Sequence, residues 1–352
     1  MSTIGRDILF IKPSDGNPRN SEGSFIRLHD GAIMFAYSKY CGTSWHDDAS
    51  ADIYAIISRD EGETWGEGRT ILKKNPSDFN IMSTSFLRMA NGDIGLFYLR
   101  KIESGDCLLE VIRSSDEGKT WSDPVRCMQS PGYYVTNNDR VIRLKNGNIL
   151  APGNLHTMKE EKNHSLNSTG RVFISTDDGC TFREAKEYME LPFESKTTGL
   201  QETGLIELED NRIWAWARTD YGFQFESFSE DGGETWSKVR PNPYFTSPCS
   251  PLSVRRLTNG DLFAVFNPIP KYNGREIYNS WGRTPLVCAV STTNDLEFGE
   301  YKIIEDDPRY GYCYTAIFPT DEYVLLAYCC GHEGHAPLEG LKIKKISVDE
   351  IL

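Results

Sequence analysis

The sequence lacks long apolar stretches. No window approaches about 18 consecutive apolar residues, the length that crosses a membrane as a helix, so no membrane span is expected. Residues 1–7 lack the charged-then-apolar pattern of a secretory signal, and we therefore expect a soluble, cytoplasmic protein. The 9 cysteines include no C-x-x-C spacing and the 6 histidines are dispersed, which argues against a disulfide framework and a zinc site. We expect neither a metal nor a cofactor.

Positive charge is also scarce. The chain has 38 Lys and Arg against 51 Asp and Glu, a net charge of −13, and no run of basic residues. A nucleic-acid partner is not expected, because phosphate binding needs a concentrated positive surface. What is present in quantity is material for a core: 39% of the 352 residues are hydrophobic. Helical periodicity is absent over any long stretch, which favours an all-β protein.

One short pattern, S-x-D-x-G-x-T-[WF], recurs along the chain. Copies occupy residues 58–65, 114–121, 175–182 and 229–236, and a decayed fifth copy spans 291–298. Successive first serines lie 56, 61, 54 and 62 residues apart, which is typical of a four-stranded propeller blade. Ser and Asp side chains can bond backbone groups across a turn, and Gly supplies a positive φ. We expect these motifs on the outer rim, with a structural role.

A second pattern places a turn between two stretches of β composition. The turns fall at 30–31, 91–92, 146–147, 210–211, 259–260 and 321–322, and we expect two-residue hairpin loops there. Six such hairpins predict a six-bladed β-propeller of four-stranded antiparallel blades, a single domain over residues 1–352. The strand around 341–349 and the N-terminal strand 7–11 should share a blade and close the ring. A ligand is expected over the central channel.

These motifs and their phasing resemble the Asp-box (BNR-repeat) sialidases, six-bladed propellers that cleave terminal sialic acids. The resemblance covers essentially the whole chain and is more specific for the fold than for the substrate. It implies three elements of a site: an arginine triad that binds the substrate carboxylate, a tyrosine nucleophile activated by a glutamate, and an aspartate general acid/base.

Blade four gives the clearest match to that pattern. Glu202 and Arg218 lie eight residues either side of the start of the turn at 210–211, so they should meet at one end of the hairpin. A carboxylate beside a phenol can accept its proton, and a guanidinium suits a carboxylate bidentately. The resemblance implies that Glu202 activates the nucleophile and Arg218 binds substrate. The alternative is a structural ion pair.

Blades five and six supply further candidates. Arg283 is similar to the family's arginine before an Asp-box strand and is the second candidate substrate arginine, with a solvated loop arginine as the alternative. Tyr314 resembles the nucleophilic tyrosine. Tyr312 is the alternate, because strand alternation puts both tyrosines on one face. For either tyrosine, a core aromatic is the other interpretation.

Blade one departs from the family pattern. Sialidases usually carry Arg-Ile-Pro before the first hairpin strand, but here Arg19 lies two positions early and Glu22 stands where the family has an apolar residue. Arg19 is a candidate third arginine. The general acid should lie in the loop 46–52, where we favour Asp47 and then Asp48; a solvated acidic loop is the alternative.

Blade three adds residues that the family pattern does not require. Asn138 and Arg140 precede one strand and His156 ends the next, so these side chains are expected to approach one another at the channel end. They suit contacts with sugar hydroxyls or a carboxylate, and Arg140 could replace the missing arginine. The alternative is a network that stabilises the loop.

Three functions follow from this pattern. The first is a retaining exo-glycosidase of sialidase type that acts on terminal sialic acid, or a related acidic sugar, of a small oligosaccharide or glycoside. The second is a glycosidase or lyase for a uronic-acid or neutral glycan, in which Glu22 and Glu202 form a carboxylate pair. The third is a non-catalytic glycan-binding propeller, since one fold serves many functions.

Overall fold

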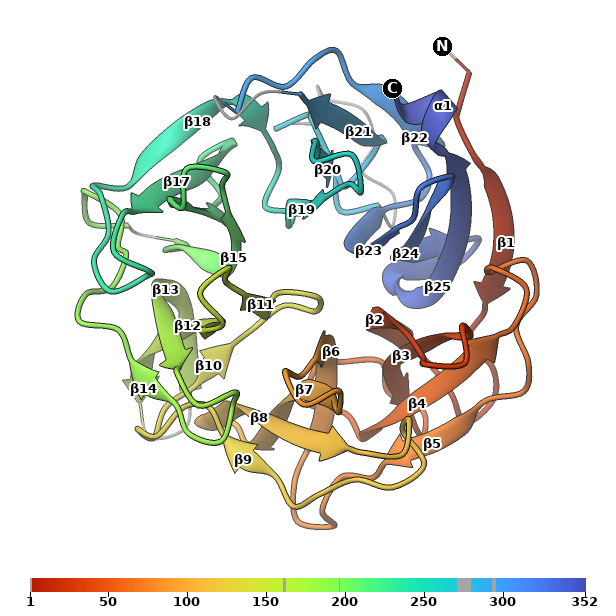
Figure 1. Ribbon diagram of the computed structural model, residues 1–352, viewed down its shortest axis with the longest axis horizontal. Coiled ribbons are helices and arrows are strands. Elements are labelled where there is room, and N and C mark those ends of the chain that lie inside the picture. Colours follow the sequence, from red (N-terminus) through yellow and green to blue (C-terminus); the bar gives the residue numbers. More distant parts are fainter. Residues whose placement is uncertain (1, 161–162, 196, 271–279, 293–295) are drawn as a thin grey trace.

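The computed structural model describes residues 2–160, 163–195, 197–270, 280–292 and 296–352. Six antiparallel sheets stand as blades around a central channel, with the first strand of each hairpin innermost (Figure 1). In the described part of the chain, the single helix, α1 (Val348–Ile351), is far too short to cross a membrane. The predicted six-bladed β-propeller is therefore confirmed.

The strands of each blade follow the chain from the channel outward. Blade one comprises β2 (Asn20–Arg27), β3 (Ile33–Tyr40), β4 (Ala51–Ser58) and β5 (Arg69–Leu72). Blade two comprises β6 (Asn80–Arg88), β7 (Ile94–Glu103), β8 (Asp106–Ser114) and β9 (Val125–Arg126). Blade three comprises β10 (Tyr134–Val135), β11 (Ile142–Arg143), β12 (Ile149–Glu160), β13 (Asn163–Ser175) and β14 (Arg183–Glu184). In blade three the innermost strand is divided into two pieces, β10 and β11, which both pair with β12.

Blades four to six follow the same plan. Blade four comprises β15 (Gln201–Glu207), β16 (Ile213–Arg218), β17 (Phe223–Ser229) and β18 (Arg240–Thr246). Blade five comprises β19 (Ser253–Arg256), β20 (Leu262–Phe266), β21 (Leu286–Ser291) and β22 (Lys302–Glu305). Blade six comprises β23 (Tyr312–Pro319), β24 (Tyr323–His332), β25 (His335–Ser347) and β1 (Arg6–Ile11). The outermost strand of blade six is thus N-terminal: β1 pairs antiparallel with β25. The expected closure of the ring is confirmed.

The core lies between the blades. Each of the six interfaces between neighbouring blades contains a cluster of buried apolar side chains. Phe97 and Phe173 join blades two and three, and Trp214 and Phe266 join blades four and five. Burying one such side chain contributes about 1.5–3 kcal/mol, so the ring is held together mainly by these interfaces.

The hairpin loops differ from the expectation in length. In blade one the amide of Leu28 donates to Ala32 O at 2.8 Å and Gly31 N donates to Leu28 O at 3.0 Å, which leaves three residues in the loop. Gly31 has φ +88°. The same pattern occurs in blades two to five, and the predicted two-residue loop occurs only in blade six, where Thr320 N donates to Tyr323 O. A left-handed third residue completes a type I turn with a bulge that matches the strand twist.

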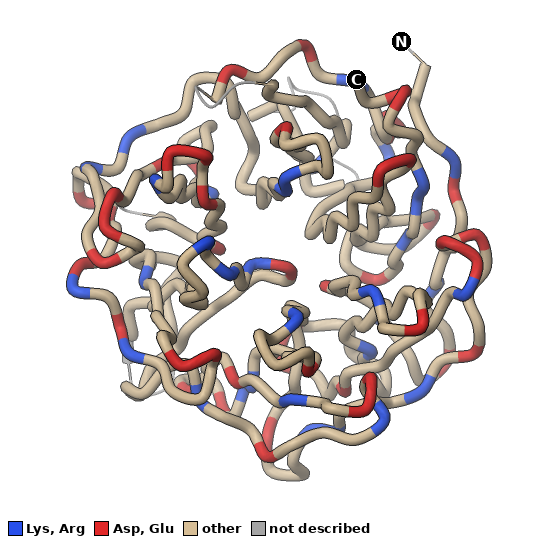
Figure 2. The backbone as a smooth tube through the Cα atoms, viewed as in Figure 1, with Lys and Arg blue, Asp and Glu red and all other residues tan. Residues whose placement is uncertain are grey.

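The Ser/Asp motifs connect the third and fourth strands of blades one to four, at the periphery of the ring (Figure 1). In the first copy Gly62 N donates to Ser58 Oγ at 2.9 Å and Thr64 N donates to Asp60 Oδ1 at 2.8 Å. The turns are therefore closed by their own side chains. Figure 2 shows that basic and acidic residues are interspersed around the rim of the ring.

Candidate active site

The innermost strands present side chains to the channel through a repeated irregularity. Strand pairing shifts register once in β2, β6, β15 and β23. In each shift one non-glycine residue adopts a left-handed backbone: Glu22 (φ 58°), Ser83 (φ 55°), Glu202 (φ 54°) and Tyr314 (φ 59°). All four line one pocket at the channel. Such strained bulges persist where the surrounding structure holds them, often at functional sites.

The pocket combines charges of both signs. Its walls come from blades one, two, three, four and six. The charged residues that line it are Glu22, Asp47, Lys101, Glu202 and Arg218. The pocket is therefore suited to a polar, hydroxyl-rich ligand rather than to an apolar one.

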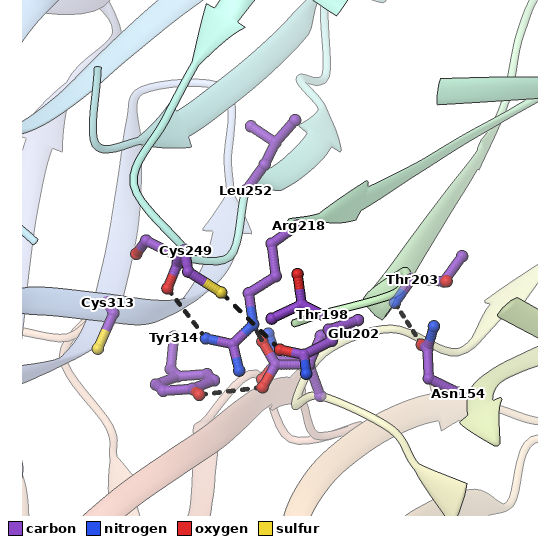
Figure 3. A network of polar contacts seen from close by, with 12 residues as sticks. Asn154, Thr198, Glu202, Thr203, Arg218, Cys249, Leu252, Cys313 and Tyr314 are labelled. Carbon is purple, nitrogen blue, oxygen red and sulfur yellow. Dashed lines mark hydrogen bonds and ion pairs between the residues drawn. The ribbon is translucent and has the colours of Figure 1, made fainter. Parts of the chain in front are cut away.

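Glu202 connects the tyrosine to an arginine. Tyr314 Oη donates a hydrogen bond to Glu202 Oε1 at 3.0 Å (Figure 3). Arg218 Nε lies 3.0 Å from Glu202 Oε2, in an ion pair that lacks hydrogen-bond alignment. The expected meeting of Glu202 and Arg218 is thus observed, because Gln201 and Arg218 are opposite each other in the β15–β16 ladder.

The phenol of Tyr314 is surrounded by charge. Burial raises its pKa, and the nearby Arg218 and Arg283 guanidinium groups oppose that rise. A buried phenol does not ionise unaided near neutral pH, so it needs a base within hydrogen-bond distance. The carboxylate of Glu202 occupies that position.

Two arginines converge on one carbonyl. Arg218 Nη1 and Arg283 Nη2 each donate to Cys249 O at 3.2 Å. Arg283 Nη1 also donates to Cys313 Sγ at 3.1 Å. Burial alone would raise the pKa of the Cys313 thiol, but Cys329 and Arg283 outweigh it and lower the pKa to about 7. The two guanidinium groups form a local positive centre beside Tyr314, where an anionic substituent is favoured. Arg218 lines the pocket, whereas Arg283 is buried behind it.

Arg19 reaches the site despite its early position in the sequence. Its Nη2 contacts Glu22 Oε2 at 2.9 Å and its Nη1 contacts Asp47 Oδ1 at 2.6 Å. Burial raises the pKa of Glu22, and Arg19 opposes that rise. For Asp47 the balance is reversed: desolvation is outweighed by Arg19, which lowers the pKa. The Asp47 side chain remains 63% exposed, at the edge of the pocket.

The sequence also contains pocket residues that pattern reasoning missed. Lys101 Nζ binds Asp48 Oδ1 at 2.7 Å and lies over the ring of Tyr133, 5.3 Å from its centroid. Tyr133 in turn stacks on His164, with the two ring centroids 3.7 Å apart. Asp48 is therefore engaged by Lys101 and does not itself line the pocket. The hairpin argument that placed Arg218 applies equally to Lys101, near the end of β7.

Comparisons with known proteins identify the family to which the chain belongs. Residues 31–326 match the family model described as a BNR repeat-like domain. The chain belongs to this family. A sialidase of Paraclostridium sordellii is 24% identical over 243 residues, which cover 62% of this chain and 57% of that protein. The chain thus matches little more than half the length of that relative.

Solved structures of other proteins show the same fold. The NanB sialidase of Streptococcus pneumoniae has a TM-score of 0.73 at 13% identity, covering 100% of this chain and 72% of that one. A leech intramolecular trans-sialidase has a TM-score of 0.72 at 16% identity, covering 100% and 71%. A Dyadobacter fermentans protein of unknown function has a TM-score of 0.73 at 17% identity, covering 97% and 99%. The expected resemblance to Asp-box sialidases is confirmed for the fold.

Blade three of this BNR propeller differs from the expectation. His156 lines the pocket, and its Nδ1 lies 2.8 Å from Ser165 O. Asn138 instead donates to Gly23 O at 2.7 Å and Tyr314 O at 3.2 Å, and Arg140 donates to Leu252 O at 2.7 Å. Neither lines the pocket. The division between β10 and β11 turns these two side chains towards neighbouring backbones, so Arg140 does not replace an arginine of the pocket.

Tyr312 also differs from the expectation. It is buried in the cluster between blades five and six and does not line the pocket. Strand alternation would place it on the face of Tyr314, but the left-handed bulge at Tyr314 breaks the alternation. In the described residues of this BNR propeller, no group of three or more His, Cys, Asp or Glu side chains could hold a metal ion.

Proposed function

We propose that this protein is a retaining exo-glycosidase of sialidase type, acting on a terminal sialic acid or a related acidic sugar of a small oligosaccharide or glycoside. The observation that carries the proposal is the hydrogen bond from Tyr314 Oη to Glu202 Oε1, beside Arg218 and Arg283. A neutral phenol avoids the repulsion that a carboxylate nucleophile would meet at an anomeric centre bearing a carboxylate.

The proposed reaction has two steps. In the first, Asp47 takes a proton from solvent against the lowered pKa that Arg19 imposes. Tyr314 Oη then attacks the anomeric carbon, Glu202 accepts the phenol proton, and Asp47 passes its proton to the departing glycosidic oxygen. In the second, Asp47 accepts a proton from a water that attacks the same carbon, and Glu202 returns its proton to Tyr314. Arg218 binds the substrate carboxylate throughout, and the positive charge of Arg283, which shares the Cys249 O contact but does not line the pocket, supports it from behind. Asp47 finally releases its proton to solvent, so the enzyme ends in its starting state.

The relatives support this substrate class. The Paraclostridium relative is named a sialidase. The leech trans-sialidase was solved with 2,7-anhydro-Neu5Ac, prepared by soaking with 3'-sialyllactose. These proteins share the propeller with this chain, and the tyrosine–glutamate pair gives this chain the groups that such chemistry needs.

The test is fluorophore release from an aryl α-sialoside. We expect turnover by the wild-type protein that collapses in Tyr314→Phe and in Glu202→Ala. Tyr312→Phe is the matched control, because that phenol lies outside the pocket. No turnover of the sialoside would contradict the proposed substrate. No turnover of any aryl glycoside would favour a non-catalytic glycan-binding propeller.

A second candidate function rests on one observation. Glu22 and Glu202 both line the pocket, and the negative charge of Glu202 contributes to the raised pKa of Glu22, after burial. Two interacting carboxyl groups are the usual equipment for hydrolysing glycosides of other sugars. Turnover of an aryl uronide or neutral glycoside, lost in Glu22→Gln but retained in Tyr314→Phe, would favour this candidate.

A further inference from the structure

The guanidinium of Arg19 is occupied by its own chain. Besides Glu22 and Asp47, it donates to Ser21 Oγ at 2.8 Å through Nε and to Trp45 O at 3.2 Å through Nη1. The side chain is 1% exposed. Arg218, by contrast, lines the pocket. A substrate carboxylate therefore meets Arg218 directly but reaches Arg19 only if Glu22 releases it.

Glu22 has one oxygen that the protein does not use. Its Oε2 accepts hydrogen bonds from Arg19 Nη2 at 2.9 Å and from Ser21 Oγ at 3.1 Å. Within the described ranges, no donor reaches Oε1, although the side chain is 6% exposed and lines the pocket. Glu22 is a lining residue, so a ligand in the pocket can reach Oε1 and donate a hydrogen bond to its free lone pairs.

Arg19 does not need Glu22 as its counter-ion in the resting pocket. Asp47 already balances it through a 2.6 Å contact. Burial, Asp47 and Glu202 all disfavour the ionised form of Glu22, and Arg19 favours it. The strained backbone of Glu22 is also shared with Glu202 and Tyr314, the two residues of the proposed chemistry. These features point to a ligand role for Glu22 rather than a purely structural one.

We propose that Glu22 is a specificity-determining residue of this pocket. It accepts a hydrogen bond from a hydroxyl of the sugar through Oε1, and by retaining Arg19 it restricts carboxylate recognition to Arg218, the arginine that lines the pocket. The substrate class is an acidic sugar that presents a hydroxyl, and not its carboxylate, to the Arg19 side of the pocket. This inference rests on the proposed function.

The test compares two ligands by calorimetry, N-acetylneuraminate and its methyl ester, which differ in the charge of one group. In Glu22→Ala, Arg19 Nη2 is free to bind a carboxylate, so the preference for the acid over the ester should rise about tenfold. Adding Arg19→Ala should return the preference to the wild-type value. The preference is the ratio of the two dissociation constants, so a loss of affinity common to both ligands cancels.

The control variants distinguish the loss of the Glu22 carboxylate from a general disturbance of the fold. Glu22→Gln keeps an acceptor oxygen, so the ester should bind Glu22→Gln more tightly than Glu22→Ala. Glu110→Gln removes a buried carboxylate that pairs with Arg100 outside the pocket, and it should leave the acid-to-ester preference unchanged. Thermal unfolding confirms that each variant is folded.

Two results would overturn the inference while leaving the proposed function intact. One is an equal change in the affinities for acid and ester in Glu22→Ala. The other is a gain in the preference for the acid over the ester that persists when Arg19→Ala is added to Glu22→Ala. Binding of neither ligand to any folded variant would overturn both this inference and the proposed substrate class. Sialoside turnover by the wild-type protein distinguishes these cases.

Discussion

Tyr314 and Glu202 are separated by 112 residues of chain, yet the phenol of one donates a 3.0 Å hydrogen bond to the carboxylate of the other. Each lies at a left-handed bulge in an innermost strand, in blade six and blade four respectively. The two bulges point their side chains into one pocket. The propeller thus brings a phenol and a carboxylate together by using the same irregularity in two blades.

This pair should behave as one unit. Glu202→Gln removes the proton acceptor, and we expect kcat/KM for an aryl α-sialoside to fall about a hundred- to ten-thousand-fold. Tyr314→Phe removes the attacking oxygen. Because the base serves only that oxygen, the double variant should be no worse than the poorer single variant. Losses that multiply in the double variant would show that the two residues act independently.

Arg218 should not be replaceable by lysine. Its planar guanidinium contacts Glu202 and Cys249 O together, and an ammonium cannot span both. We expect Arg218→Lys to lower kcat/KM for an aryl α-sialoside about 10- to 100-fold, chiefly through a higher KM. Arg240 is an exposed arginine that pairs with the buried Glu226 away from the pocket, so Arg240→Lys is the matched control and should retain activity. Equal losses in both variants would argue against a substrate contact.

The Ser/Asp motifs should support the fold and not the chemistry. Ser229 is buried, donates to Asp231 Oδ1 at 2.9 Å and accepts from Gly233 N at 2.8 Å. Ser229→Ala leaves a buried amide without its acceptor, so the free energy of unfolding should fall by about 1–3 kcal/mol in urea titrations. The kcat/KM of the folded variant should be that of the wild type. A variant of normal stability with impaired turnover would contradict the structural role.

Stability should fall with acid partly because of His156. Burial lowers the pKa of this imidazole to about 4, from an ordinary value near 6.5. Between these values the unfolded chain binds a proton that the folded chain does not, so stability decreases as the pH falls. The full effect is about 3 kcal/mol. In urea titrations between pH 7.5 and 4.5, His156→Asn should show a shallower decline than the wild type, and parallel declines would exclude this cause.

Local patterns predicted the fold well. Each blade repeats its own turn chemistry, so the spacing of serines and of six Asn- or Asp-led turns, four of them with glycine second, was enough to count the blades and to close the ring through β1 and β25. The loop lengths were wrong in five blades, because a dipeptide signal does not show whether its left-handed residue is the second or third of the loop.

The site was harder to predict. The meeting of Glu202 and Arg218 followed from one hairpin, but contacts between blades depend on the bulges, which have no marker in a single sequence. A bulge reverses which side of a strand faces the channel, so Tyr312 was expected beside Tyr314 and is instead in the core. The pairing of Arg19 with Glu22 depends on a bulge in the same way. Lys101 is different, because the hairpin argument applied to β7 would have placed it at the pocket.

The central claim is that Tyr314 forms the covalent intermediate with help from Glu202, and trapping that intermediate tests it most directly. The protein would be incubated with 2,3-difluorosialic acid, digested and examined by peptide mass spectrometry. We predict a single fluorosialyl adduct on Tyr314, absent in Tyr314→Phe and formed more slowly in Glu202→Gln. An adduct on another residue, or steady turnover of the aryl sialoside with inversion at the anomeric carbon, would contradict the account.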